Sequence, residues 1–183
     1  NLGRWSVTGV NNTFMSISFL LKIERISKSW RNIFHVSESA DQGCCNIGDR
    51  VPALWIVPNS TKLLYVNDLM NRGNPPYTYT NEGIGIEKPT LVSITIVNKK
   101  VTIYFNRKVV AQWNYPDKLY KASANAYFYF NWNRPNAVYW SVQNFSFYNK
   151  ILIEQDIQSL YDQYKNLLHK QFELFQGIST LPS

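Results

Sequence analysis

Hydrophobic and polar residues alternate in three short runs between Leu91 and Trp113. In the first run, valine and isoleucine at every second position alternate with serine and threonine. The triplets Asn98–Lys100 and Asn106–Lys108 separate this run from the next two. A period of two turns one face of a strand toward the core, while asparagine tolerates the backbone of tight turns. The segment therefore predicts a three-stranded antiparallel meander with one apolar and one polar face.

Similar runs recur elsewhere along the chain, with turn-forming residues between them. One run lies between Pro52 and Pro58, which suit strand ends because proline cannot donate to a sheet ladder. Residues 67–89 are polar and rich in glycine and proline, and they predict a loop with room for one short strand. The additional predicted strands are Phe14–Ile23, Trp30–Val36, Ala53–Val57, Leu63–Val66, Ala126–Trp132 and Ala137–Tyr148. Short strands at such spacing predict an all-β fold, a two-sheet antiparallel sandwich.

The C-terminal part changes to a helical pattern. Apolar residues recur at steps of three and four from Ile157 to Phe175, and Gly177 follows them. Glu154 and Asp156 stand where the positive end of a helix dipole favours acidic side chains. The sequence therefore predicts a sandwich over residues 1–152 and an amphipathic α-helix over residues 153–176.

The charge of the chain favours anionic partners only weakly. The 183 residues carry a formal net charge of +7, but their lysines and arginines are scattered, with pairs as the largest clusters. Nucleic-acid recognition usually needs a concentrated basic face, so we expect no nucleic-acid partner. No run of 18 apolar residues exists in the sequence. Membrane attachment is therefore expected only through a segment upstream of Asn1, if one exists.

Four segments taken together resemble the concanavalin A-like lectin/glucanase superfamily, in its laminin-G and pentraxin-like branch. They are Phe14–Lys22, Leu91–Asn106, Val142–Lys150 and Ile157–Tyr161. Asp49–Pro58 is also similar to laminin-G-like domains in virion proteins of large DNA viruses. The resemblance implies a jelly-roll sandwich with a C-terminal helix. It also implies a virion or another extracellular, surface-exposed location.

Glucanases of this superfamily carry clustered acidic residues, because glycoside hydrolysis needs two carboxyl groups facing one bond. No such cluster occurs here: Glu82 and Glu87 are five positions apart in a glycine-rich segment. His35 and His169 are isolated from serine or aspartate at catalytic spacings. We therefore expect no enzymatic activity.

Many relatives bind calcium through loop carboxylates, which raises the question of a cofactor. The loop candidates are Asp41, Asp49, Asp68 and Glu82, and no two of them have a diagnostic spacing. We assign no metal site and no cofactor, and leave calcium open as an alternative.

The best glycan-site candidate lies on and beside the run Ala126–Trp132. If Ala126, Phe128, Phe130 and Trp132 face the core, the alternate residues point outward, where aromatic rings can stack on sugars. Tyr104 can join them from the polar face of the meander. The candidate ligand-binding residues are Tyr104, Tyr127, Tyr129, Asn131, Trp132, Asn133 and Arg134. The alternative is that the tyrosines form ordinary cross-strand pairs or pack against another protein.

The predicted helix is longer than in relatives, where it stops near the position of Tyr161. Its extra turns must bury Leu167, Leu168, Phe172 and Phe175, either on the sandwich or on a partner. The first functional hypothesis is a non-catalytic structural or interaction protein. It would be a minor capsid or surface component of a virion that contacts other structural proteins. The alternative is a carbohydrate-binding module that recognises cell-surface or cell-wall polysaccharide.

Overall fold

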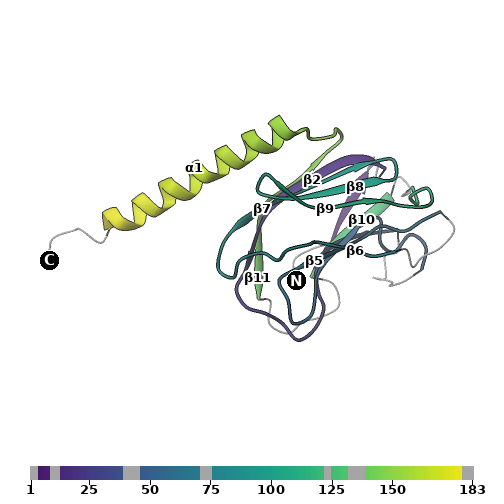
Figure 1. Ribbon diagram of the computed structural model, residues 1–183, viewed down its shortest axis with the longest axis horizontal. Coiled ribbons are helices and arrows are strands. Elements are labelled where there is room, and N and C mark those ends of the chain that lie inside the picture. The colour runs from purple at the N-terminus through teal and green to yellow at the C-terminus, as the bar shows by residue number, and fades with distance from the viewer. Residues whose placement is uncertain are drawn as a thin grey trace.

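A computed structural model describes residues 4–8, 13–38, 46–70, 76–121, 125–131 and 139–178. Two antiparallel sheets face each other, and one helix follows the last strand (Figure 1). The sequence prediction of an all-β antiparallel sandwich with a C-terminal α-helix is confirmed. The helix α1 spans Glu154–Ile178.

The first sheet has six strands in the order β1-β10-β3-β4-β5-β6. Their bounds are β1 Arg4–Thr8, β10 Asn125–Phe130, β3 Arg31–Ser37, β4 Ala53–Ile56, β5 Leu63–Val66 and β6 Thr78–Tyr79. β1 was not predicted from the sequence. β6 is the single short strand for which the polar stretch 67–89 left room.

The second sheet has five strands in the order β11-β2-β7-β8-β9. Their bounds are β11 Trp140–Tyr148, β2 Phe14–Ile23, β7 Thr90–Val97, β8 Lys100–Phe105 and β9 Lys108–Asn114. The strands β7, β8 and β9 form the predicted meander. Asn98 and Asn106 occupy its two turns with φ angles of 55° and 56°, which asparagine tolerates better than most residues.

The core lies between the two sheets and is rich in phenylalanine. The rings of Phe19 and Phe145 stack with centroids 5.3 Å apart, and those of Phe34 and Phe128 stack at 5.6 Å. Phe128 is 3% exposed, and Ala126 on the same strand is fully buried. The predicted inward face of β10 is therefore confirmed for these two residues.

The outer face of the five-stranded sheet is polar but buried. Ser16, Ser18 and Ser93 on β2 and β7 are at most 3% exposed. The backbone N–H of Leu152, just before α1, donates to the Ser16 hydroxyl over 2.8 Å. Small polar side chains thus let the chain and the start of α1 lie close against this sheet, so α1 has a seat on the sandwich.

Candidate functional site

The first turns of α1 are fixed to the sandwich by a small apolar cluster. Tyr164 is 9% exposed and packs with Leu20 of β2 and Leu91 of β7, and Leu160 and Tyr161 pack against the same cluster. A pocket of about 190 Å³ remains between this part of α1 and the sheet. The first turns of α1 therefore lie against the sandwich.

The start of α1 is defined by Asp156. Its carboxylate accepts a hydrogen bond from the backbone N–H of Ile153 over 3.0 Å and pairs with Lys150 over 3.1 Å. These two contacts lower the pKa of Asp156, the backbone hydrogen bond first. An acidic side chain in this position satisfies an otherwise unpaired N–H and interacts favourably with the helix dipole. The contacts of Asp156 with Ile153 and Lys150 therefore fix where α1 begins.

The distal half of α1 extends away from the sandwich (Figure 1). A helix of 25 residues is about 37 Å long, which exceeds the length seated on the sheet. Leu167, Leu168, Phe172 and Phe175 lie in this distal half, and their side chains are outside the described residues. Within the part of the chain that is described, no helix is both long and apolar enough to cross a membrane.

The predicted glycan site is not assembled as expected. Tyr127 lies on β10 of the six-stranded sheet, whereas Tyr104 lies on β8 of the five-stranded sheet. Outward-facing residues of the two sheets point to opposite sides of a sandwich, so Tyr104 cannot join Tyr127. Tyr104 lies instead near Glu154 and Thr95, and burial is the main cause that raises its pKa. The expected tyrosine cluster is therefore split.

Tyr129 also differs from the expectation of an outward ring in water. It is 2% exposed, and its ring stacks on His35 of the neighbouring strand β3 with centroids 4.8 Å apart. Burial lowers the pKa of His35 to about 3. Tyr127 and Asn131 are half-buried. The remaining predicted ligands, Trp132, Asn133 and Arg134, lie outside the described residues.

The candidate calcium carboxylates do not form a metal site in the described part of the chain. Asp68 accepts hydrogen bonds from the backbone N–H groups of Gly48 and Arg50, each over 3.1 Å, and its other oxygen faces the Arg50 guanidinium at 3.5 Å. Burial raises the pKa of Asp68 to about 6, so the carboxylate is charged at neutral pH. A guanidinium therefore occupies the place where a cation would be needed.

The other carboxylates are engaged elsewhere. Asp49 accepts a hydrogen bond from the backbone N–H of Asn46 over 2.8 Å, and Glu82 pairs with Lys108 over 2.7 Å. Asp41 lies outside the described residues. Among the residues described, no three histidine, cysteine or acidic side chains gather to hold a metal ion. The described candidate carboxylates are therefore engaged with other groups of the protein.

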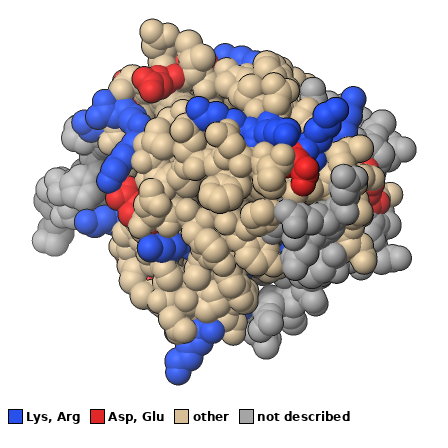
Figure 2. All heavy atoms as spheres, turned by 45° about the vertical axis from the view of Figure 1, so that its right-hand side comes forward, with Lys and Arg blue, Asp and Glu red and all other residues tan. Residues whose placement is uncertain are grey.

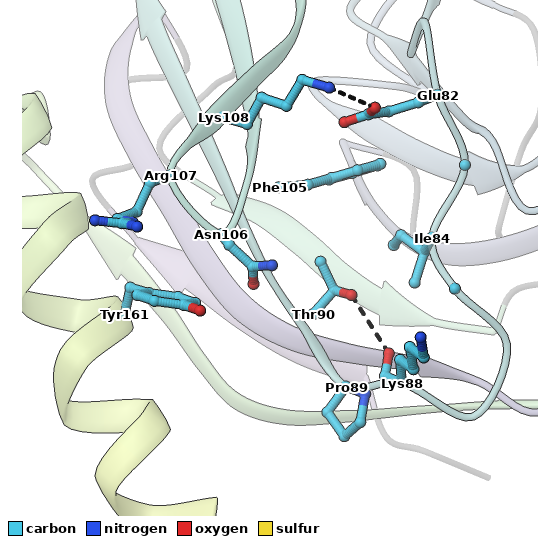
Figure 3. A pocket seen from close by; sticks show the side chains of 12 residues that line it. Glu82, Ile84, Lys88, Pro89, Thr90, Phe105, Asn106, Arg107, Lys108 and Tyr161 are labelled. Carbon is cyan, nitrogen blue, oxygen red and sulfur yellow. Dashed lines mark hydrogen bonds and ion pairs between the residues drawn. The ribbon is translucent and has the colours of Figure 1, made fainter.

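Sequence reasoning missed a pocket with a volume of about 650 Å³. It lies between the loop Glu82–Thr90, the β8–β9 turn and the first turns of α1 (Figure 3). Phe105 and Ile84 form apolar parts of its wall, and both are buried. Lys88, Arg107 and Lys108 line it, so it is a basic pocket.

The β8–β9 turn and α1 are joined at this pocket. The Arg107 guanidinium donates a hydrogen bond to the side-chain amide oxygen Oε1 of Gln158 over 2.7 Å. The guanidinium carbon of Arg107 lies 5.2 Å from the centroid of the Tyr161 ring, within cation–π range. From sequence, Arg107 and Lys108 were assigned only to the turn triplet Asn106–Lys108. The residues that contact Arg107 here, Gln158 and Tyr161, lie about 50 positions further along the chain.

The wider surface is basic in several places rather than one. On the face shown in Figure 2, lysine and arginine side chains form groups separated by uncharged surface, and acidic side chains are fewer. This pattern follows the scattered cations of the sequence.

No protein-family model and no curated protein matches this chain. Solved structures do resemble it. A crystal structure of the botulinum neurotoxin serotype D binding domain matches with a TM-score of 0.59 at 15% identity, over 87% of this chain and 42% of that one. An HCR/D mutant matches with a TM-score of 0.60 at 18% identity, over 88% and 41%. Trypanosoma rangeli sialidase matches with a TM-score of 0.55 at 14% identity, over 82% and 22%.

These likenesses show the fold and nothing finer. The chain spans less than half the length of each of these three structures. They support a two-sheet β-sandwich fold, which is the coarser part of the resemblance suggested by sequence.

Proposed function

We propose that this chain is a non-catalytic interaction protein that acts through protein contacts, as a minor capsid or surface component of a virion. The observation that carries the proposal is α1, which is seated on the sandwich by its first turns and then continues beyond it (Figure 1). The partners are other structural proteins of the assembly, rather than nucleic acid.

The distal half of α1 is apolar enough in sequence to favour contact with a partner. Its sequence carries two leucines and two phenylalanines at helical spacing, namely Leu167, Leu168, Phe172 and Phe175. Complete burial of such side chains stabilises by about 1.5–3 kcal/mol each, so their contact with a partner is worth roughly 6–12 kcal/mol before the cost of association. Because association itself costs about 4–15 kcal/mol, these side chains would anchor a complex with an apolar groove together with further contacts.

Two similarities support the proposed interaction role and its surface-exposed location. One of the neighbours is described as a binding domain, and its fold is shared by this chain. The segment Asp49–Pro58 is similar to laminin-G-like domains of virion proteins. We propose a virion or another surface-exposed location from this similarity.

The proposal is tested by asking whether α1 holds the protein on assembled particles. The wild type and the double variant Leu168→Glu/Phe172→Glu are each expressed in cells that produce the assembled particles. The particles are then purified on a density gradient. We expect the wild type to sediment with particles and the double variant to stay in the unassembled fraction. Lys170→Glu, on the same half of α1, is the matched charge control and should behave like the wild type. Equal recovery of wild type and double variant with particles would refute the proposal.

A second candidate function is a carbohydrate-binding module for cell-surface or cell-wall polysaccharide. The pocket beside α1 favours it, because a half-buried aromatic ring (Tyr161), a side-chain amide (Asn106) and charged groups converge there. Sugar sites combine such a ring with polar groups that fix orientation. Screening the whole chain on a glycan array tests this candidate, and an array without any specific signal would argue against it.

A further inference from the structure

We infer that the pocket between the loop Glu82–Thr90, the β8–β9 turn and α1 binds an acidic saccharide, a pyranose that bears a carboxylate or a sulfate. The inference rests on the carbohydrate-binding candidate and adds the chemical class of the sugar and the residues that select it. Four observations carry it: preformed walls, uncompensated positive charge, an oriented arginine and a neighbouring ring with an amide.

The loop wall of the pocket is fixed by backbone contacts before any ligand arrives. The N–H of Ile84 donates to the carbonyl of Thr61 over 3.1 Å, and the N–H of Glu87 donates to the carbonyl of Ile23 over 2.8 Å. A Cβ at Gly83 would lie 2.2 Å from the Thr61 hydroxyl oxygen, so only glycine allows this close approach. A preformed pocket loses less entropy on binding.

The charge in the pocket is positive. Lys88, Arg107 and Lys108 contribute three cations and Glu82 one carboxylate, which leaves an excess of two positive charges. Glu82 pairs with Lys108 over 2.7 Å. Among the ion pairs of the described residues, neither Lys88 nor Arg107 has a carboxylate partner. These two side chains are therefore the ones that an anionic group can neutralise.

Within the described part of the chain, the groups that hold Arg107 in place are neutral. Its hydrogen bond to Gln158 and its position over the Tyr161 ring fix the guanidinium without cancelling its charge. A guanidinium presents several N–H donors in one plane and matches the geometry of a carboxylate or sulfate. An oriented arginine of this kind favours an acid group over a neutral hydroxyl.

A ring and an amide lie beside the arginine, as a sugar requires. Tyr161 projects from α1 toward the pocket, and Asn106 lies between Arg107 and Thr90 (Figure 3). The Asn106 side-chain oxygen accepts a hydrogen bond from the N–H of Leu91 over 3.0 Å, which turns its NH₂ group into the available donor. The volume of about 650 Å³ is within the usual range for small-ligand pockets and exceeds what a single inorganic anion needs.

The test is a calorimetric titration of the full chain with three tetrasaccharides of equal length. One is sulfated (heparin-derived), one is carboxylated (polygalacturonate-derived) and one is neutral (cellotetraose). We expect at least one acidic tetrasaccharide to bind about tenfold or more tightly than the neutral one, as charge-assisted hydrogen bonds predict. Because the heparin-derived sugar carries carboxylates as well as sulfates, binding of the polygalacturonate-derived sugar would show that a carboxylate suffices, whereas binding of the heparin-derived sugar alone would show that sulfate is required.

Variants separate this pocket from general attraction between a basic protein and a polyanion. Arg107→Gln and Lys88→Gln should each weaken binding of the acidic tetrasaccharide about tenfold, since each removes one charged contact. Lys100→Gln is the matched control, because it removes an equally exposed charge at the opposite end of β8. Its affinity should stay within about twofold of the wild type, since one distant charge is screened by salt.

Each contrary result has a distinct meaning. Equal binding of the neutral sugar would overturn the acidic inference and leave the carbohydrate-binding candidate standing. Equal losses from Lys100→Gln and Arg107→Gln would also overturn it, because the attraction would then be non-specific. Binding of none of the three would overturn the inference as well. None of these results bears on the particle experiment with α1, which uses other residues.

Discussion

His35 should make the stability of this protein sensitive to acid. It lies on the outer side of the six-stranded sheet, 2% exposed and stacked on Tyr129. Burial lowers its pKa in the folded protein from 6.5 to about 3. A group with a depressed folded pKa binds its proton more readily in the unfolded chain. Its contribution to stability is therefore complete above pH 6.5 and is lost as the pH falls toward 3.

The size of the loss follows from linkage. Each pH unit below the unfolded pKa costs about 1.4 kcal/mol, so the loss reaches roughly 3 kcal/mol at about pH 4.5. Asp68 acts in the opposite sense, because burial raises its folded pKa from 3.8 to about 6. Its protonation stabilises the fold by roughly 2 kcal/mol over the same range. Together the two groups leave only about 1 kcal/mol of net change, so the acid sensitivity of His35 is hidden in the wild type.

The perturbation that reveals it is His35→Gln, which keeps a polar side chain but does not titrate. Urea unfolding of wild type and variant, followed by tryptophan fluorescence in reducing buffer, gives the difference in unfolding free energy at about pH 7.5 and about pH 4.5. The contribution of Asp68 cancels in that difference. We expect the advantage of the wild type to shrink by roughly 3 kcal/mol at the lower pH. Tyr127→Phe, on the same face, should show a difference independent of pH. A constant difference for His35→Gln would refute the buried, neutral histidine.

Two further predictions concern the helix seat and the buried ion pair. Tyr164→Ala removes the side chain that packs on Leu20 and Leu91 and should lower the unfolding free energy by about 3 kcal/mol. Hydrogen exchange of α1 should then accelerate more than that of β7, and equal acceleration would show that the helix is not a separate unit. Arg50→Met leaves the Asp68 carboxylate buried without its cation and should cost about 3 kcal/mol at about pH 8. The cost should fall at about pH 5, where Asp68 is protonated, and a cost that rises there would contradict the ion pair.

Local patterns predicted the strands well, because alternation and turn chemistry are recorded in consecutive residues. The meander from β7 to β9 and the left-handed asparagines Asn98 and Asn106 follow directly from such patterns. The same alternation identified the inward face of β10 correctly. It could not say which sheet each strand joins, and Tyr104 and Tyr127 were grouped although they belong to different sheets. Pairing order depends on contacts between residues far apart in sequence, which a single chain does not display.

The pocket was missed for the same physical reason. Its walls come from three segments, and only the turn with Arg107 carries a visible sequence signal. The sequence predicted that the extra turns of the helix need a surface, and it left the sandwich and a partner open. In the structure the turns up to Tyr164 are seated on the sandwich and the rest of α1 extends away from it, so a partner for that part stays a proposal. The serines and leucines on which α1 packs come from β2 and β7. They could be identified as one surface only after the pairing of these two strands was known.

The two proposed binding functions share one element, so they should be energetically coupled. Gln158 and Tyr161 of α1 hold Arg107 at the pocket, and one turn later Tyr164 anchors the same helix to the sheet. An acid group that takes hydrogen bonds from the remaining N–H donors of Arg107 binds the same side chain that Gln158 holds, and this links the saccharide to the orientation of α1. A partner bound to the distal half of α1 biases that orientation from the other end. Because coupling between two binding events is reciprocal, whatever change the saccharide makes in partner affinity, the partner must make in saccharide affinity.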